Sequence, residues 1–358
     1  MNLAFLFDTS LFNRVFDLKL KISRVKMVIL KGLKIAVISW LLTVCFTSVN
    51  VIGAKWYQQK INIMGTTAKV ELWSENETAA SMAIQDVFAA MEHVNATMIP
   101  YIETSELYKI NKRASQMPMK ISTELFQLLE YAIDMSLLSN GAFDITFSSV
   151  GYLYNYREHV APSATTIKNL KNAINYRWVK LESSPQTIFF KNPNVKIDLG
   201  GIAKGYAVDE GIKALKARGI KHALVNAGGD SRIIGDRMGR PWYIGIKHPR
   251  NLSKVASKLP LVNVAVSTSG DYERFFEKNG VRYHHIIDPK TGSSSKNSQS
   301  VTIIADTSTY ADALSTSVFV LGVEEGLKLV NGLDDVSAVI IDAQGKLHYS
   351  DDLVMQTQ

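Results

Sequence analysis

The chain alternates between segments with helical spacing of apolar residues and segments with strand-like alternation. Residues 61–73 (INIMGTTAKVELW) alternate and are rich in β-branched residues, which predicts a strand. Apolar residues at helical spacing predict a helix over 77–96 and another over 122–139. Ser122 is the expected N-cap of the second helix, and Asn140-Gly141 ends it because both residues tolerate the left-handed conformation.

The rest of the chain mixes both patterns. We expect a helix and then extended chain over 161–180, and a hairpin over 187–199 with its turn at Asn192-Pro193-Asn194. The remaining predicted elements are a helix over 200–220, strands at 222–230, 241–246, 283–289 and 300–305, a strand, turn and short helix over 262–276, a helix over 309–321 and a hairpin over 337–350. Because no regular βαβ rhythm is present, the sequence predicts an α/β fold with a mixed sheet and flanking helices, not a Rossmann fold. We expect a single domain with two lobes over 55–358.

Positive charge is concentrated at the N-terminus. Of the 358 residues 46% are hydrophobic and 20% are charged, and the formal net charge is +7. Residues 1–54 contain seven Lys and Arg against Asp8 and Asp17, whereas the remaining chain has 33 basic and 31 acidic residues. Residues 55–358 contain no basic cluster interleaved with aromatic residues, so nucleic-acid binding is not expected.

Residues 1–54 have the features of a secretory leader. Lys31 and Lys34 precede the apolar run 35–53, which ends at Ala54 before a polar stretch. A positive flank, an apolar centre and a small terminal residue are typical of a signal peptide, and we favour cleavage after about Ala54 over a retained membrane anchor. In either case the charge asymmetry predicts that the body lies outside the cytoplasm, in the periplasm or at the outer face of the membrane.

Two further features of the leader bear on the mature protein. Met27 is an alternative start, which would remove an unusually long basic region before the apolar run. Cys45, the only cysteine, lies inside that run, so no disulfide can form within the chain. A body outside the cytoplasm must therefore be stable from its core alone.

Gly-rich turns next to charged residues are the main chemical signal. The sequence has no GxxxxGK[ST] loop, GxGxxG spacing, GxSxG elbow or HExxH motif. In the segment 197–205 (IDLGGIAKG) a strand ends in Asp198 and a helix begins with Lys204, where free N–H groups can hold phosphate. Asp312 and Thr316 lie four residues apart on one helical face, and such oxygen ligands suit Mg²⁺. Taken singly, each motif also fits a helix cap or a tightly packed turn.

Taken together and in order, these motifs resemble the ApbE family of FAD:protein FMN transferases. The resemblance runs from Met64 to about Val330. Its segments are MGT (64–66), SELYKIN (105–111), GAFDIT (141–146), IDLGGIAKGYAVD (197–209), LVNAGGD (224–230), STSGDYERFF (267–276), HHIIDP (284–289) and ADALST (311–316). No single motif is specific for the family, but the whole set of motifs in the correct order is specific for it.

The resemblance implies a set of site residues. The implied FAD contacts are Met64, Tyr101, Ala142, Phe143, Asp144, Asp198, Lys204 and Ile287. The implied Mg²⁺ ligands are the Gly201 carbonyl, Asp312, Ser315 and Thr316. Position 315 is Asp and position 204 is Glu in some members, so the roles of these two side chains stay open. The family's usual acceptors are flavin-carrying subunits of sodium- or electron-pumping respiratory complexes, which the leader would allow this chain to meet at the membrane.

The expected reaction is Mg²⁺-dependent transfer of FMN from FAD to a Thr or Ser hydroxyl of an acceptor protein, with AMP leaving. A Mg²⁺ offsets the pyrophosphate charge and orients the groups in line, while Met64, Tyr101 and Phe143 suit the flat rings. Two alternatives stay open. Water could replace the acceptor, giving an FAD pyrophosphatase, or the protein could bind flavin without turnover. The Asp312–Thr316 pair argues against simple flavin binding.

His285 matches the family histidine that helps to activate the acceptor hydroxyl. An imidazole with an ordinary pKa near 6.5 accepts a proton at neutral pH, and general-base catalysis contributes about 10²–10⁴-fold. We expect His284 to face the opposite side of the strand and to tolerate substitution. The alternative for His285 is a packing role beneath the flavin.

Overall fold

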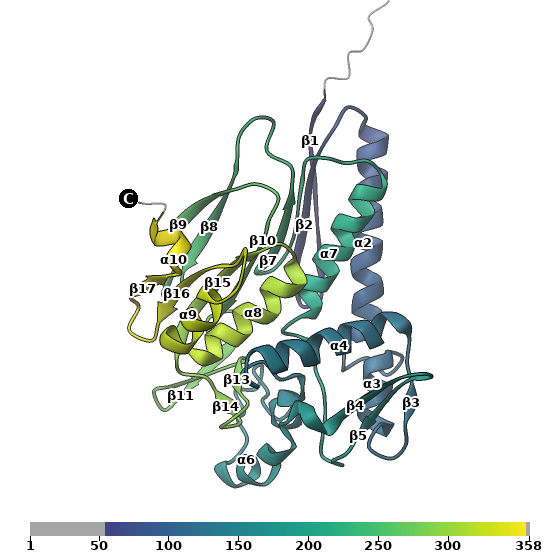
Figure 1. Ribbon diagram of the computed structural model, residues 1–358, viewed down its shortest axis with the longest axis vertical. Helices are drawn as coiled ribbons and strands as arrows, with labels where there is room; N and C mark the ends of the chain where they lie inside the picture. The colour runs from purple at the N-terminus through teal and green to yellow at the C-terminus, as the bar shows by residue number, and fades with distance from the viewer. Residues whose placement is uncertain (1–53, 356–358) are drawn as a thin grey trace, which may run out of the picture. The chain divides into compact units, whose positions relative to one another are not determined.

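A computed structural model of the protein describes residues 54–355 (Figure 1). The predictions for the signal peptide, for Met27 and for Cys45 concern residues that lie outside this range. Within 54–355, no helix is both long enough and apolar enough to cross a bilayer.

The body is organised around an eight-stranded sheet with the order β1-β2-β6-β7-β10-β15-β16-β17. Its strands are β1 (Lys55–Ile63), β2 (Thr66–Ser74), β6 (Ala223–Ala227), β7 (Asp230–Ile234), β10 (Ala265–Gly270), β15 (Ser298–Ala305), β16 (Ser337–Asp342) and β17 (Leu347–Tyr349). The predicted α/β class without a Rossmann fold is confirmed. Every neighbouring pair is antiparallel, so the parallel pairs of a mixed sheet do not occur among the described strands of this sheet.

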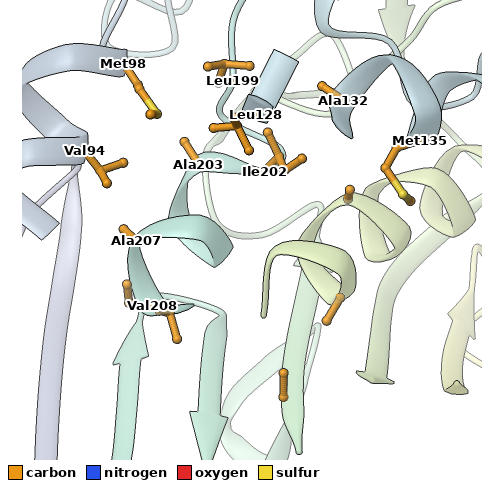
Figure 2. Packing of buried hydrophobic residues seen from close by; sticks show 14 of the residues in the cluster. Val94, Met98, Leu128, Ala132, Met135, Leu199, Ile202, Ala203, Ala207 and Val208 are labelled. Carbon is orange, nitrogen blue, oxygen red and sulfur yellow. The ribbon is translucent and has the colours of Figure 1, made fainter. Parts of the chain in front are cut away.

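Four helices pack against this sheet, and the main core lies between the two layers (Figure 1). They are α2 (Glu77–Met98), α7 (Ala203–Ala217), α8 (Ser308–Leu321) and α9 (Val323–Asn331). Alternate residues of β2, such as Val70 and Leu72, are fully buried beneath them, as period-2 patterning requires. Figure 2 shows Val94 and Met98 of α2 in one buried cluster with Ile202 and Ala203 at the start of α7.

Residues 99–199 form the second group of elements, inserted between α2 and α7. They comprise α3 (Glu106–Arg113), α4 (Thr123–Leu138), α5 (Ser148–Gly151), α6 (Ala164–Leu170), short 3-10 turns and a sheet of β3 (Met119–Lys120), β5 (Gln186–Phe190) and β4 (Val179–Ser183). Leu128 and Ala132 of α4 belong to the same core as Ile202, which joins this group to the sheet (Figure 2). The start of α7 is therefore held from two sides.

Short elements complete the fold. They are the hairpin of β8 (Trp242–His248) and β9 (Asn251–Leu261), the hairpin of β11 (Phe275–Lys278) and β12 (Val281–His284), the pair β13 (Ile287–Asp288) and β14 (Ser293–Ser294), and α10 (Asp351–Met355). The β11–β12 hairpin and the β13–β14 pair carry the predicted His285 and Ile287 region next to the end of β10.

Four predicted elements are wrong in detail. The strand over 283–289 is interrupted at His285 and Ile286, between β12 and β13. Residues 61–73 form parts of two strands, because Met64 and Gly65 adopt positive φ of 52° and 70° and turn the chain between β1 and β2. The hairpin over 187–199 does not form. β5 pairs with β4 instead, and the backbone of Ile197 bonds to the Asn111 side chain at 2.8 Å. The short helix expected after Gly270 is absent, and β11 follows the turn there.

Candidate active site

Helices α7 and α8 meet at a glycine. An ideal Cβ on Gly205 would lie 2.2 Å from the Ser308 carbonyl oxygen, so the two helices can approach this closely only at a residue without a side chain. The Gly205 amide donates to Oδ2 of Asp312 at 3.0 Å. It is one of the first amides of α7, which have no acceptor within the helix because α7 begins at Ala203. The first turn of α7 thus fixes the Asp312 carboxylate.

A lysine and two aspartates form a buried charged cluster beside this contact. The Lys204 ammonium is ion-paired with Asp230 and lies 3.6 Å from Oδ2 of Asp312. Burial, and then the charge of Asp230, raises the pKa of Asp312 to about 7, while Lys204 opposes the rise. Burial by itself would lower the pKa of Lys204, but the two carboxylates raise it, so the lysine stays charged.

This cluster changes the interpretation of two residues. Lys204 was expected at an FAD phosphate, but its ammonium is engaged by carboxylates of the protein. Asp230 was not among the predicted site residues, although it is 1% exposed and lies at the centre of the cluster. The available signal was its place directly after Gly228-Gly229, at the end of a motif. Asp312, the other aspartate of the cluster, is 82 positions away in sequence, so motif spacing could not show that the two residues share Lys204.

Four hydroxyl groups from β10 and α8 adjoin the carboxylates. Ser269 Oγ lies 2.9 Å from Ser315 Oγ and 3.3 Å from Thr316 Oγ1. Ser315 also donates to the Asp312 carbonyl at 2.9 Å, and it lies 3.2 Å from Ser267 Oγ. The predicted Ser315 hydroxyl is therefore engaged by protein groups. The strand β10 supplies the serines because it lies between β7 and β15 in the sheet.

The predicted magnesium ligands come together at the α7–α8 contact. A Cβ on Gly201 would lie 3.3 Å from Thr316 Oγ1, so that hydroxyl adjoins the backbone of Gly201. Asp312 supplies a buried carboxylate one turn before Thr316. Within 54–355 there is no group of three or more His, Cys, Asp and Glu residues suited to a metal. Mg²⁺, however, needs only one or two carboxylates together with neutral oxygens, waters and substrate phosphates, so the residues fit this ion.

Several predicted flavin contacts line a second region. Met64 and Gly65 form the β1–β2 turn and border an open hollow of about 640 Å³, a volume within the range of small-molecule sites. The Tyr101 hydroxyl donates to Oδ2 of Asp198 at 3.4 Å, and the Gly200 amide donates to Oδ1 at 2.7 Å. Tyr101 itself is 69% exposed, so its ring is available to a ligand.

Two of the predicted flavin residues have side chains committed to the fold. Asp144 is buried, and its Oδ1 accepts from the Thr146 amide and hydroxyl while its Oδ2 accepts from the Tyr176 amide. Ile287 packs in a small apolar cluster with Val150. At Asp144 and Ile287, therefore, a ligand could contact only the backbone. Among the neighbouring predictions, Ala142 is buried and the Phe143 ring adjoins Gly201.

The two neighbouring histidines have different surroundings. His284 is 3% exposed, its Nε2 bonds to the Ser295 carbonyl at 2.7 Å and its Nδ1 accepts from the Ile286 amide. It is therefore a core residue, and this burial argues against the expectation that it tolerates substitution. His285 has a buried Nδ1 without a partner among the described residues. Burial, and then the positive charge of Arg274, lowers the pKa of His285 to about 3.

Comparison with known proteins identifies the family. The sequence model of the ApbE family matches residues 64–340. The FAD:protein FMN transferase of Treponema pallidum is 32% identical over 304 residues, covering 80% of this chain and 84% of the relative. The FAD:protein FMN transferase of Vibrio cholerae is 33% identical over 272 residues, covering 74% of this chain and 81% of the relative.

Solved structures agree with the sequence comparison. The ApbE protein of Thermotoga maritima superposes with a TM-score of 0.78 at 34% identity, covering 84% of this chain and 99% of that one. The flavin transferase ApbE of Vibrio cholerae gives a TM-score of 0.76 at 28% identity, covering 85% and 99%. The chain therefore belongs to the ApbE family, and the predicted family, fold and transferase class are confirmed.

Proposed function

We propose that this protein uses Mg²⁺ to transfer FMN from FAD to a Thr or Ser hydroxyl of an acceptor protein and releases AMP. The observation that supports this best is the arrangement at the start of α7. The Gly205 amide holds the Asp312 carboxylate, and the Thr316 hydroxyl adjoins the backbone of Gly201. The relatives named above carry the same activity in their names.

The proposed step is a displacement at phosphorus. The acceptor oxygen forms a bond to the phosphorus of the FMN half, and the bond from that phosphorus to the bridging oxygen breaks. AMP leaves with the bridging oxygen and its charge, and the acceptor proton passes to a base. Little covalent chemistry falls to the protein, so positioning and charge carry the catalysis.

Mg²⁺ bound by Asp312, Thr316 and the Gly201 carbonyl would offset the pyrophosphate charge. Lys204 holds Asp230 and Asp312 together, so that two carboxylates can share one buried region without a second cation. Tyr101 and the Met64 turn would hold the rings in the adjoining hollow. These are the groups that orient FAD for attack.

His285 is the proposed proton acceptor. Its buried Nδ1 has no partner within 54–355, and its lowered pKa keeps the ring neutral at physiological pH. A base with so low a pKa has little driving force in the ligand-free protein. The negative pyrophosphate of FAD raises its proton affinity, since an opposite charge nearby favours the imidazolium form. The base would thus be activated when the substrate is present.

We further propose that the body works outside the cytoplasmic membrane. The basic flank and apolar run of residues 1–54 support export or anchoring. Acceptors of that compartment would be flavin-carrying subunits of membrane respiratory complexes, as the family resemblance implies.

One experiment separates the proposed transfer from its alternatives. AMP release from FAD and Mg²⁺ is measured with an acceptor protein, and with the same acceptor after its Thr and Ser residues are changed to Ala. A transferase releases AMP only with the intact acceptor, in equal amount to labelled protein. Equal release with both acceptors would indicate a pyrophosphatase. Flavin binding without AMP release would indicate a binding protein.

A further inference from the structure

The segment 267–276 contains two charged residues, Glu273 and Arg274, whose side chains make no hydrogen bond or ion pair with any residue in 54–355. Ser267 and Ser269 join the hydroxyl network, and Asp271 is held by Arg250 at 2.6 and 2.7 Å. Phe276 is buried in an aromatic stack. Arg274, by contrast, is exposed, and its side chain has no hydrogen bond or ion pair with any residue in 54–355. A structural role does not account for this arginine.

The side chain of Arg274 stands over the predicted flavin region. Its Nη2 lies 3.5 Å from the position that a Cβ on Gly65 would take, so the guanidinium faces the β1–β2 turn. Its backbone carbonyl accepts the His285 amide at 3.1 Å. The backbone therefore fixes the position of Arg274 relative to the candidate base.

Arg274 also acts electrostatically on the groups around this region. Burial raises the pKa of Asp198, and the Gly200 amide and then the Arg274 charge oppose the rise. The same charge lowers the pKa of His285. Lys204 is already matched by Asp230 and Asp312, whereas Arg274 has no ion-pair partner among the described residues. Arg274 therefore adds positive charge near Asp198 and His285 without forming an ion pair itself.

We propose that Arg274 binds the pyrophosphate of FAD directly. A guanidinium presents a planar fork of donors that matches phosphate oxygens, and it stays charged at any working pH. Because its backbone is bonded to that of the proposed base His285, the guanidinium would act near the phosphorus that the acceptor attacks, where negative charge grows as AMP leaves. The inference rests on the proposed function and adds a residue that binds the substrate.

The test measures binding without turnover. FAD and riboflavin, which has no phosphate, are titrated separately into the full-length protein without Mg²⁺, and binding is followed by flavin fluorescence. The variants are Arg274→Gln and Arg274→Lys. The control is Arg240→Gln. Arg240 is exposed, lies outside the predicted site and forms no ion pair with any described residue.

We expect Arg274→Gln to weaken FAD binding by about 10- to 100-fold, because charge-assisted hydrogen bonds are lost, and to leave riboflavin binding unchanged. Arg274→Lys keeps the charge without the fork and should fall between Arg274→Gln and the wild type. Equal losses for FAD and riboflavin would show that the guanidinium contacts the ring system instead. Unchanged FAD affinity in Arg274→Gln would also overturn the proposal. Failure of the proposed function would give a different result. The wild-type protein would then release no AMP but would still bind FAD and riboflavin with different affinities.

Discussion

Replacing Gly205 by alanine tests whether the α7–α8 contact builds the site. The added Cβ would lie 2.2 Å from the Ser308 oxygen and 2.8 Å from Cβ of Asp312, whereas ordinary contacts begin near 3.4 Å. The helices must therefore separate by roughly 1 Å at a backbone carbonyl that cannot rotate away. Overpacking of this kind costs about 1–3 kcal/mol or more, and the better helix propensity of alanine returns about 1 kcal/mol. We expect a net loss of up to about 2 kcal/mol.

The catalytic loss should be larger than the stability loss. A displacement of about 1 Å separates Asp312 from the Gly205 amide and from the Gly201 carbonyl, and misplacement on that scale costs about 100-fold in rate. Thermal unfolding followed by circular dichroism, together with Mg²⁺ titration of AMP release, measures the two effects separately. Gly332→Ala is the matched control, because its nearest atoms would lie 3.5 Å from the new Cβ and its φ is −92°. A folded Gly205→Ala protein with wild-type Mg²⁺ dependence and rate would refute the assigned arrangement.

Four further predictions follow from the same site and from the leader. Asp312→Ala should abolish Mg²⁺-dependent transfer while FAD binding persists in weakened form, and normal turnover at low Mg²⁺ would show that the metal site lies elsewhere. His285→Ala should slow single-turnover transfer by at least roughly tenfold with little change in FAD affinity, whereas a defect in affinity alone would indicate packing beneath the flavin. In the ligand-free protein, NMR should show the His285 ring neutral down to about pH 4, because its pKa is lowered to about 3. Since that value lies below the unfolded one near 6.5, His285 lowers the free energy of unfolding progressively as pH falls through this window, and a titration near 6.5 would contradict the assigned burial. Cell fractionation should find residues 55–358 outside the cytoplasm, and a body protected from protease in intact spheroplasts would contradict export.

The helices could be predicted well because their signals are local. Helix α4 begins and ends within one residue of its predicted bounds, and Ser122 accepts the Leu125 amide as the expected N-cap. Helix α2 extends two residues past its predicted end at 96. In both cases a periodic apolar face and a capping side chain lie within the same short window.

The failures have non-local causes. The β1–β2 turn at Met64 was missed because alternation continues across it, and a non-glycine residue with positive φ has no strong sequence signal. Residues 195–199 alternate as a strand would, since Val195, Ile197 and Leu199 are buried. The backbone of Ile197 bonds instead to the Asn111 side chain, 86 positions away, and the backbone of Lys196 bonds to Ser149. The hydrophobic pattern predicts which residues are buried, but it does not predict which groups form hydrogen bonds with their backbone.

The same distinction applies to the site. Asp312 and Thr316 could be predicted because four-residue spacing on a helix places them on one face. Asp230 and Arg274 could not, since their roles depend on neighbours that only the fold provides. Asp230 reaches Lys204 and Ser267 because β7 lies next to β10, in a register that pairs Asp230 with Ser267. Arg274 meets Gly65 and His285 across a turn and a hairpin.

The central claim is that FMN leaves FAD and becomes covalently attached to another protein. The most direct test incubates the purified protein with FAD, Mg²⁺ and an acceptor protein containing a Thr or Ser, and then measures the intact mass of the acceptor. We predict a mass gain equal to one FMN in phosphoester linkage, mapped by fragmentation to a Thr or Ser and lost when EDTA removes Mg²⁺. An acceptor of unchanged mass, with FMN and AMP free in solution, would contradict it.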